Sequence, residues 1–508
     1  MDQLTNLAEG FAIAFTPSNL LFLVIGAVLG TAVGVLPGLG SAMAVALLLP
    51  VTFTLDPTGA FIMFASIYFG GLFGDSTAGI LLNTPGNSSA IATTFEGYRM
   101  AKSGRAAKAL GTSATGAFIG GIIACTLVVF FSPYIADLAR VFGPAEYFAL
   151  AVVAFVAISS VVADSIVRGL VGLGLGFAVA LIGIDGTSGA ERFTGGSPLL
   201  FDGVSIIVIT VGLLAVGEVL HVGAYIRTGG GPTRLIDSSG SPFLTRKDWR
   251  KAGPAFLRGA SFGVPFGVIP VGGSEVPTFL AYGTEKRLAR RRKDPDFGTR
   301  GAIQGVAAPE AAGNATAGTA MGALLALGLP TSATAAMMIA AFQQYGMQPG
   351  PLLFERSADL VWPLLASFFL GLVILLIINL PFAAVWAKLL LVPRHYLYAG
   401  ILVLAMLGVY AVASRPFDLW VALVIGVVGF VMRRYSLPIA PVLIAAILGP
   451  VAETQLRRAL AVSEGDPIAL VSSPVPIVLY SLLAIVVVIS AVQHLRAARA
   501  ARGERVPA

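Results

Sequence analysis

The chain has 508 residues, of which 56% are hydrophobic and only 12% are charged. Soluble globular domains carry about 25% charged residues, so this composition argues against a soluble enzyme. The formal net charge is +7, but the basic residues cluster in short segments between apolar runs, as they do in the cytoplasmic loops of membrane proteins. Nucleic-acid binding is therefore not indicated.

Apolar runs suited to a lipid bilayer recur along the whole chain. A membrane-spanning helix needs about 20 mostly apolar residues. Runs of this kind lie at 20–36, 106–131, 148–163, 204–222, 360–387, 397–413 and 474–492. We therefore expect an all-α, polytopic membrane protein. Its one cysteine, Cys125, can form neither an intrachain disulfide nor a CxxC metal pair, so redox chemistry and structural zinc are not expected.

An internal repeat relates the two halves of the chain. The segment "GTAVGVLPGLGS" at 30–41 aligns with "GVPFGVIPVGGS" at 263–274 at a constant offset of 233 (267 − 34). Further on, "LLNTPGNSSA" at 81–90 aligns with "ALGLPTSATA" at 326–335 at an offset of 245 (330 − 85). The twelve extra residues (245 − 233) fall between the two motifs, in the segment 283–300.

Basic residues predict that the two halves are inverted. Segment 51–59 has no Lys or Arg, whereas its counterpart 283–300 is strongly basic; the reverse holds for 99–108 and 346–359. Because Lys and Arg collect on the cytoplasmic side, equivalent loops should face opposite compartments. Inverted repeats of this kind are typical of secondary transporters, whose substrate sites lie on discontinuous helices near the bilayer midplane. The expected parts are a first repeat at 1–222, a cytoplasmic linker at 223–258, and a second repeat with a basic tail at 259–508.

Two polar, proline-containing segments interrupt the apolar pattern at equivalent places. Open backbone groups are tolerated in a membrane only where they are buried in protein or line a watery cavity. The free N–H groups at a half-helix N-terminus would also bind anions. We expect helix breaks or re-entrant hairpins at "NTPGNSS" and "LPTSATA". The candidate substrate-binding residues are Asn83, Thr84, Pro85, Gly86, Asn87, Ser88, Ser89, Pro330, Thr331, Ser332 and Thr334.

Acidic residues near both breaks are candidates for ion coupling. Carboxylates inside a membrane are costly and often mark ion or proton pathways. The candidates come from "FGDST" and "PEAAGNATAG" and are Asp75, Ser76, Glu310, Asn314 and Thr316. The structural alternative is that small and hydroxylated residues serve close helix packing, and that the carboxylates are structural ion partners.

Two other functions compete with secondary transport. An intramembrane serine protease of rhomboid type would use Ser188 in "GTSG" with His221 as the base, within hydrogen-bond reach. However, Ser188 lies in the Gly-rich, charged stretch 183–196, which is typical of a solvated turn. A passive anion channel would also need a polar midplane, although paired breaks favour alternating access. No phosphate-binding loop is present in the sequence, so we expect a non-enzymatic permease that depends on an ion gradient or on another subunit.

Several long motifs resemble one family. The segments "GVLPGLGSAMAVALLLPVTF", "GILLNTPGNSSAIATTFEGYRMAKSGRAAKAL", "GIDGTSGAERFTGG" and "GVAAPEAAGNATAGTAMGALLALGLPTSATAAMMIAAF" are similar to the TctA family, the large permease subunit of tripartite tricarboxylate transporters. The resemblance extends over residues 20–490 and also suggests kinship with elevator-type carriers. Such carriers hold substrate and sodium at two tips, here Asn83 to Ser89 and Pro330 to Thr334.

The resemblance implies a multi-pass permease of the bacterial inner (cytoplasmic) membrane. It implies two partners, a small four-helix membrane subunit and a periplasmic solute-binding protein. The implied cargo is a di- or tricarboxylate or related organic anion, imported by symport with a sodium ion or a proton and without another cofactor. One difference from the family pattern is Pro330-Thr331, where the family usually has Pro-Gly. A β-carbon at 331 restricts positive φ, so local geometry there should differ.

Overall fold

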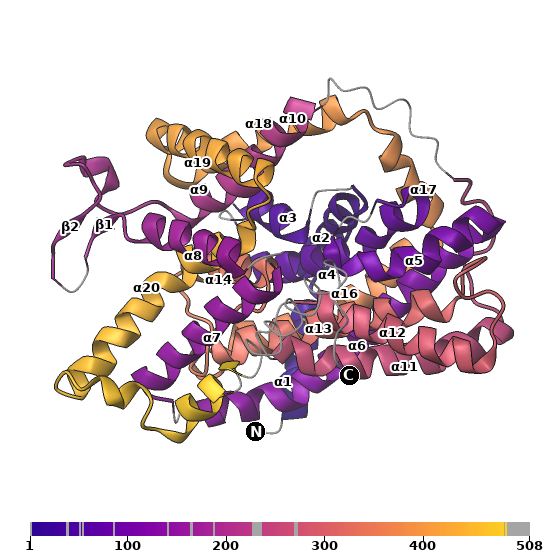
Figure 1. Cartoon of the computed structure of the whole chain (residues 1–508), viewed down its shortest axis with the longest axis horizontal. Coiled ribbons are helices and arrows are strands. Elements are labelled where there is room, and N and C mark those ends of the chain that lie inside the picture. The colour runs from indigo at the N-terminus through magenta and orange to yellow at the C-terminus, as the bar shows by residue number, and fades with distance from the viewer. Residues whose placement is uncertain are drawn as a thin grey trace, which may run out of the picture. The chain divides into compact units, whose positions relative to one another are not determined.

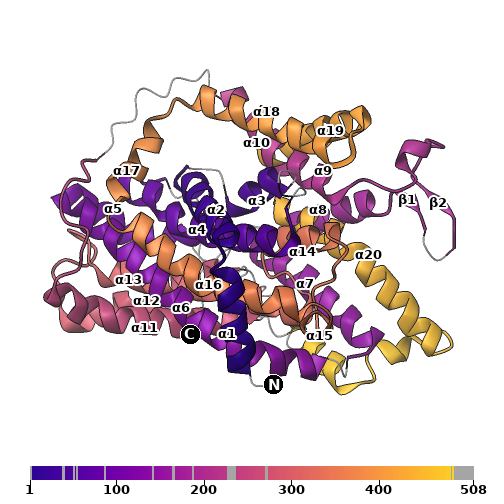
Figure 2. The same ribbon diagram turned by 180° about the vertical axis from the view of Figure 1, so that it is seen from behind.

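The computed structural model describes residues 3–484 apart from ten short gaps, and the described chain is almost wholly helical (Figures 1 and 2). The gaps are 37–39, 50–51, 53–54, 85–86, 140–141, 163–165, 186–187, 226–235, 269–272 and 482. Two of the candidate substrate-binding residues, Pro85 and Gly86, therefore lie outside the described residues, as do the Ser88 side chain and part of the last apolar run.

The chain divides into two compact units, and the larger comprises 1–139, 205–269 and 273–434. The helices of its first half are α1 (Gln3–Ala14), α2 (Pro17–Val35), α3 (Ser41–Leu48), α4 (Pro57–Leu82), α5 (Ile91–Met100), α6 (Ala106–Ala139), α9 (Ile206–Thr210) and α10 (Gly217–Tyr225). Those of its second half are α11 (Arg246–Val268), α12 (Glu275–Arg292), α13 (Gln304–Leu327), α14 (Ala333–Gln344), α15 (Leu353–Arg356), α16 (Ala358–Asn379), α17 (Ala383–Ala387), α18 (Arg394–Ala413) and α19 (Pro416–Arg434).

The smaller unit comprises 140–204, 270–272 and 435–508. Its helices are α7 (Pro144–Val162), α8 (Ile166–Ala180) and α20 (Ile439–Val462), and α20 packs against both of the others. Two short antiparallel strands, β1 (Gly183–Ile184) and β2 (Glu191–Arg192), form a hairpin after α8. This hairpin occupies the Gly-rich stretch expected to be a turn.

Within the described residues, seven helical segments are long and apolar enough to cross a membrane. They are Pro17–Val35, Pro57–Leu82, Ile91–Ile135, Ile206–Ala224, Ala358–Asn379, Pro416–Arg434 and Ile439–Val462. The protein is therefore an all-α, multi-pass membrane protein, as predicted. Three of these spans, Pro57–Leu82, Pro416–Arg434 and Ile439–Val462, were not among the predicted apolar runs. In Pro57–Leu82, glycines and polar residues reduce the mean hydropathy.

The two helices that lead into the predicted breaks form the centre of the larger unit. In α4 every residue from Gly59 to Leu81 is buried, and in α13 every residue from Gln304 to Ala326 is buried. Neither helix has a polar face that could be turned to water. Their hydroxyl, amide and carboxyl groups must therefore find partners inside the protein.

Glycines allow α2 to approach α4 and α11 to approach α13 at backbone distance. A methyl group on each of these glycines would lie closer than 3.0 Å to a carbonyl oxygen of the facing helix. The pairs are Gly26 with Met63, Gly30 with Ile67, Gly34 with Gly71, Gly259 with Ala308, Gly263 with Ala312, and Gly267 with Thr316. Glycines and carbonyls recur every four residues, about one helical turn. The two sets are related by offsets of 233 (259 − 26) and 245 (308 − 63), which are those of the sequence repeat.

After each break, a long helix packs against the central helices of the opposite half. Helix α6 packs against α13 and α11 of the second half, and α16 packs against α4 and α2 of the first half. Figures 1 and 2 show these elements together around α4 and α13. Each central helix pair is thus covered by a helix from the other half.

Two segments expected as loops are largely helical. Helix α12 continues to Arg292, so most of the insertion lengthens a helix. In 99–108 the backbone is helical except at Gly104, whose φ of 80° and ψ of 16° separate α5 from α6. Glycine adopts this left-handed conformation without a steric penalty. The basic side chains in these segments do not prevent a helix from forming.

Helix α11 begins within the segment expected as the linker. The Asp248 carboxylate accepts hydrogen bonds from the Thr245 N–H (2.8 Å) and the Thr245 hydroxyl (2.7 Å), and Lys108 Nζ lies 2.9 Å from it. Partial burial disfavours the charged carboxylate, but these partners hold the pKa of Asp248 below its usual value. Thr245 and Asp248 thus cap the N-terminus of α11, and Lys108 ties this cap to the start of α6.

Candidate functional site

The helices before the two breaks end in the same way. Asn83 ends α4 with φ 58° and ψ 26°, and Gly328 ends α13 with φ 70° and ψ 22°. The two positions differ by 245 (328 − 83), the offset of the second repeat motif. Left-handed residues are common just past a helix C-terminus, and Gly and Asn adopt that conformation most readily. The chain thus leaves both helices at equivalent positions.

After each break a second helix begins. Ser332 caps α14, because its Oγ accepts a hydrogen bond of 3.1 Å from the Ala335 N–H. In the first half a 3₁₀ turn at Ser88–Ala90 precedes α5, and the Asn87 carbonyl accepts a bond of 3.1 Å from the Ala90 N–H. The first N–H groups of α14 have no partner within their own helix, which favours an anion there.

The first break lies against a buried carboxylate on α4. Asp75 is 4% exposed, and its Oδ2 accepts hydrogen bonds from Ser89 Oγ (3.1 Å) and Asn87 Nδ2 (3.4 Å). Ser76 Oγ lies 3.3 Å from the other oxygen, Oδ1. The break therefore supplies neutral donors to a carboxylate inside the protein.

A second buried carboxylate, from the other half, joins the same cluster. Glu310 on α13 accepts a hydrogen bond from Ser76 Oγ, so this serine contacts both acidic side chains. The amide of Asn314 donates to the Glu310 carbonyl (3.1 Å), whereas its Oδ1 is buried without a hydrogen-bond partner among the described residues. A small cavity is lined by these side chains and by Ser89. The cluster offers oxygen atoms to a proton or a hard cation.

The second break has neutral surroundings. Thr334 Oγ1 lies 3.0 Å from Ser41 Oγ at the start of α3, and the Tyr68 side chain on α4 lies beside Ser332. The Thr331 hydroxyl is buried without a partner among the described residues. Hydroxyl and N–H donors therefore gather here without a neighbouring acidic side chain in the contacts that the structure describes.

Each break contacts the segment that follows the Gly-rich motif of the opposite half. Helix α3 packs against α14, and α12 packs against the 3₁₀ turn at Ser88–Ala90. Within the first half, a methyl group at Gly40 would lie 2.9 Å from Asn87 Oδ1, so the Gly-rich motif also approaches its own break.

Some of the candidate residues are not brought into these clusters. The Thr316 hydroxyl bonds to the carbonyls of Gly263 (3.0 Å) and Ala312 (2.8 Å), which gives it a packing role between α11 and α13. Asn83 and Thr84 are exposed, and Asn83 serves as the helix end. Pro330 is buried, and the structure gives it no polar contact of its own among the described residues.

Sequence reasoning missed Ser41 and Tyr68. Ser41 ends the first repeated motif and matches Ser274, so the repeat itself carried a signal. Tyr68, whose hydroxyl also lies 3.4 Å from the Ala317 carbonyl, stands in α4 among glycines and apolar residues that gave no signal. Thr93 and Ser113 lie beside Glu310, and that contact depends on packing between helices distant in the sequence.

The serine of the protease alternative lies on the hairpin of the smaller unit. Ser188 is exposed, and its Oγ donates a hydrogen bond of 2.7 Å to Asp185. The hairpin is fixed to α20 by Arg192, which pairs with Asp185 and with Glu453 at 2.9 Å. In this arrangement Ser188 stabilises a charged turn.

Comparison with known proteins decides the family. The model of the "Tripartite tricarboxylate transporter TctA family" matches residues 20–444. The chain belongs to the TctA family. This confirms the resemblance inferred from the motifs and places the protein in a family of transporters, so a permease role is supported over a protease.

Two relatives come from Agrobacterium vitis. One, described as an uncharacterized 52.8 kDa protein in the TAR-I ttuC' 3' region, is 37% identical over 500 residues, which cover 98% of both chains. The other, an uncharacterized protein in the TAR-II ttuC' 3' region, is 37% identical over 234 residues, covering 46% of this TctA chain and 95% of the relative. No solved structure matches the chain.

Proposed function

We propose that the protein is an ion-coupled permease that imports di- or tricarboxylates or related organic anions across the bacterial inner membrane. It would work with a small four-helix membrane subunit and a periplasmic solute-binding protein. The observation that carries the proposal is the difference between the breaks: one adjoins two buried carboxylates, and the other presents only neutral donors. The first break would suit a cation and the second would suit an anion, and both breaks belong to the larger unit.

The architecture proposed is a pair of inverted-topology repeats. The reversal of loop charge supports it, because equivalent loops carry basic residues in opposite halves. The matched glycine contacts between α2 and α4 and between α11 and α13 support it as well. Transporters with such repeats alternate access by moving one part against another around a central site.

The second break is the proposed contact for a substrate carboxylate. The N-terminus of α14 supplies N–H groups, and Thr331 supplies a buried hydroxyl that lacks a partner among the described residues. Neutral donors can hold a multiply charged anion without trapping it in ion pairs. The β-carbon of Thr331 replaces the usual glycine, and its hydroxyl would be an additional donor to the substrate.

The first break is the proposed coupling site. Asp75 and Glu310 are joined through Ser76, and like charges repel strongly in a medium of low dielectric constant. A sodium ion or a proton would relieve this repulsion, and the free Oδ1 of Asn314 could add a ligand for sodium. With both carboxylates charged, an anionic substrate nearby would be repelled. Coupling would thus follow from the cation binding before the substrate.

A passive anion channel is the competing function. A channel would equilibrate its substrate and would not need a carboxylate pair beside the break. A coupled transporter accumulates substrate against its gradient. Accumulation therefore separates the two functions.

The test is uptake of labelled di- and tricarboxylates into vesicles that contain the full chain, its small partner and the cognate binding protein. Sodium and proton gradients are imposed separately. The proposal predicts accumulation of at least one carboxylate under one of the two gradients. Equilibration without accumulation would favour a channel, and the absence of any uptake with verified assembly would contradict the carboxylate assignment.

A further inference from the structure

A second, larger pocket lies between α5 and α12, away from the carboxylate cluster. Its walls carry the aromatic rings of Phe95, Tyr282 and Phe297 and the basic side chains of Arg99, Lys286, Arg290 and Lys293. The transport proposal uses none of these residues. The combination of cations with aromatic faces suits an anion attached to an apolar body.

Three of the pocket's cations are not neutralised by the protein. Among the described residues, Lys286, Arg290 and Lys293 form no ion pair. The one carboxylate in the wall, Asp294, is already engaged by Gln304 (2.8 Å) and Lys251 (3.4 Å). The pocket therefore has an excess of positive charge that an anion would balance.

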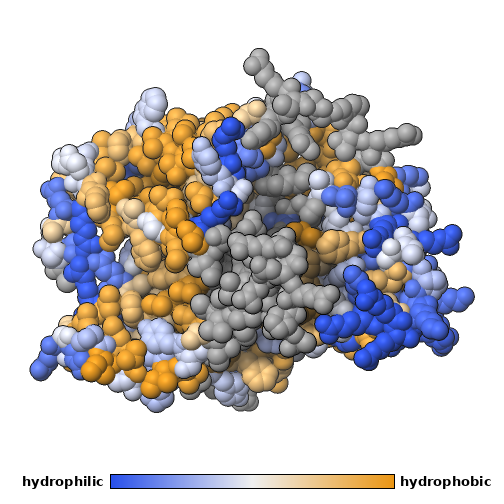
Figure 3. Space-filling view, viewed as in Figure 1, coloured by the Kyte–Doolittle hydropathy of each residue, from blue (hydrophilic) through white to orange (hydrophobic). Residues whose placement is uncertain are grey.

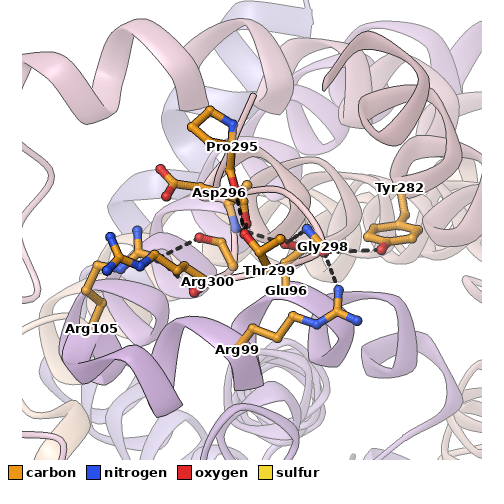
Figure 4. A network of polar contacts seen from close by, with 11 residues as sticks. Glu96, Arg99, Arg105, Tyr282, Pro295, Asp296, Gly298, Thr299 and Arg300 are labelled. Carbon is orange, nitrogen blue, oxygen red and sulfur yellow. Dashed lines mark hydrogen bonds and ion pairs between the residues drawn. The ribbon is translucent and has the colours of Figure 1, made fainter. Parts of the chain in front are cut away.

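The floor of the pocket is held in place by the buried carboxylate of Glu96 (Figure 4). Its oxygens accept hydrogen bonds from the N–H groups of Gly298 (3.1 Å) and Ala302 (2.9 Å). Arg99 Nη1 lies 3.0 Å away, and the Tyr282 hydroxyl donates at 3.3 Å. These bonds fix α5 to the segment between α12 and α13 and so hold the floor of the pocket in place.

The Tyr282 hydroxyl remains a neutral donor in this network. Burial and, after it, the neighbouring Glu96 carboxylate raise the pKa of Tyr282 to about 12. Its ring packs 5.2 Å from Phe95 and 5.6 Å from Phe297 between centroids. The aromatic wall and the hydrogen-bonded floor thus support each other.

The residues around the pocket indicate that it lies at the membrane–water boundary. Phe95 is 41% exposed, and its neighbour Phe279 on α12 is 42% exposed. Figure 3 shows hydrophilic side chains gathered where α5, α11 and α12 lie in the view of Figure 1. Basic residues next to exposed apolar rings are typical of the cytoplasmic interface, where anionic headgroups are found.

We propose that this pocket binds a phosphate group, with Lys286, Arg290 and Lys293 as its cationic ligands. The phosphate can come from the headgroup of an anionic phospholipid or from a soluble phosphate ester of the cytoplasm. Lysine and arginine make strong, charge-assisted hydrogen bonds to phosphate oxygens. The exposed rings beside the pocket would contact the acyl chains of a lipid.

The test measures binding of tail-labelled phosphatidylglycerol to the purified full-length protein in detergent. The pocket variant is Lys286→Gln/Arg290→Gln/Lys293→Gln. The matched control is Arg287→Gln/Arg291→Gln/Arg292→Gln, which removes the same charge from α12 outside the pocket wall. All six side chains are exposed, so both variants should fold, and the single change Lys286→Gln is a milder check. Size-exclusion profiles verify assembly.

The expected result is an affinity at least about ten-fold lower for the pocket variant and within about two-fold of wild type for the control. Competition by unlabelled ligands then shows whether the phosphate comes from a lipid headgroup or from a soluble ester. If unlabelled phosphatidylglycerol competes and glycerol 3-phosphate does not, the ligand is a lipid headgroup; if glycerol 3-phosphate competes, a soluble ester binds too. Equal binding by wild type and the pocket variant, or an equal loss in the control, would overturn the proposal. Carboxylate uptake has no part in this readout, so failure of the transport proposal would be seen separately.

Discussion

The Ser41 Oγ lies 3.0 Å from the Thr334 Oγ1, although 293 residues (334 − 41) separate them. The serine ends the Gly-rich motif of the first half, and the threonine stands in the break of the second. Helix α12 makes the equivalent approach to the first break. Each break is therefore supported by the opposite half, and a movement of one half must change the surroundings of both.

A disulfide between these positions should form readily. In a Cys125→Ala background, Ser41→Cys/Thr334→Cys should cross-link under mild oxidation, because the side-chain oxygens are already in contact. We expect uptake to fall on oxidation and to return on reduction, since alternating access needs the two segments to separate. Mass spectrometry of peptides measures the cross-link. The single-cysteine variants are the controls, and a cross-linked protein that transports at the wild-type rate would contradict the expected motion.

Removing either buried carboxylate should uncouple transport from its gradient. Asp75→Asn keeps the size of the side chain, but it removes the charge that a cation would balance and replaces one acceptor oxygen with a donor. Gradient-driven accumulation should fall at least about ten-fold, corresponding to about 1.4 kcal/mol, while exchange of substrate across the membrane without a gradient persists. Glu310→Gln should behave in the same way. The matched control is Glu464→Gln, an exposed acid in the smaller unit; full accumulation by Asp75→Asn would remove the carboxylate pair from the coupling site.

Methyl groups at the helix contacts should destabilise both halves to a similar degree. Gly34→Ala and Gly267→Ala each place a Cβ against a carbonyl oxygen of the facing helix. Overpacking of this kind costs about 1–3 kcal/mol, so the unfolding temperature should fall. Gly283→Ala is the control, because a Cβ there meets no atom within 4 Å. Tryptophan fluorescence during heating measures the effect, and no difference between the three variants would contradict the close packing.

The Glu96 carboxylate should stabilise the junction between α5, α12 and α13. Glu96→Gln removes the negative charge and one of the acceptors for the Gly298 and Ala302 N–H groups. Leaving buried donors unsatisfied costs about 1–3 kcal/mol. Arg99→Gln should cost less, about 0–1 kcal/mol, because the Arg99 side chain is 43% exposed and surface pairs contribute little. Hydrogen exchange in 296–302 measures the loss, and equal protection in both variants would contradict this role.

The sequence predicted the class, the family and the positions of the breaks. Composition and apolar runs indicated an all-α membrane protein, and the motifs indicated the TctA family. The span α4 escaped the hydropathy pattern, because a helix buried within the protein can carry residues such as Asp75 that a lipid-facing helix cannot. Because α4 packs against α2, α16 and α6, its polar side chains are kept inside the protein.

The partners in the site depend on contacts that one sequence does not reveal. Asp75 and Ser89 are close in the chain, and their contact could be anticipated from a helix break. Glu310 joins them only because α13 packs beside the first break, 235 residues (310 − 75) later. The repeat could have indicated Ser41, because this residue matches Ser274. It could not show which side chains of the two halves contact each other.

The role of the two breaks in transport is tested most directly by comparing initial uptake rates for break variants in vesicles with both partner proteins. Ser89→Ala removes a donor to Asp75, and Ser332→Ala/Thr334→Ala removes hydroxyls at the second break. We predict that both variants insert normally but lose most of the gradient-driven accumulation of the carboxylate that wild type takes up, while Gly283→Ala retains it. If both break variants accumulate this carboxylate at the wild-type rate, the breaks are not the transport site.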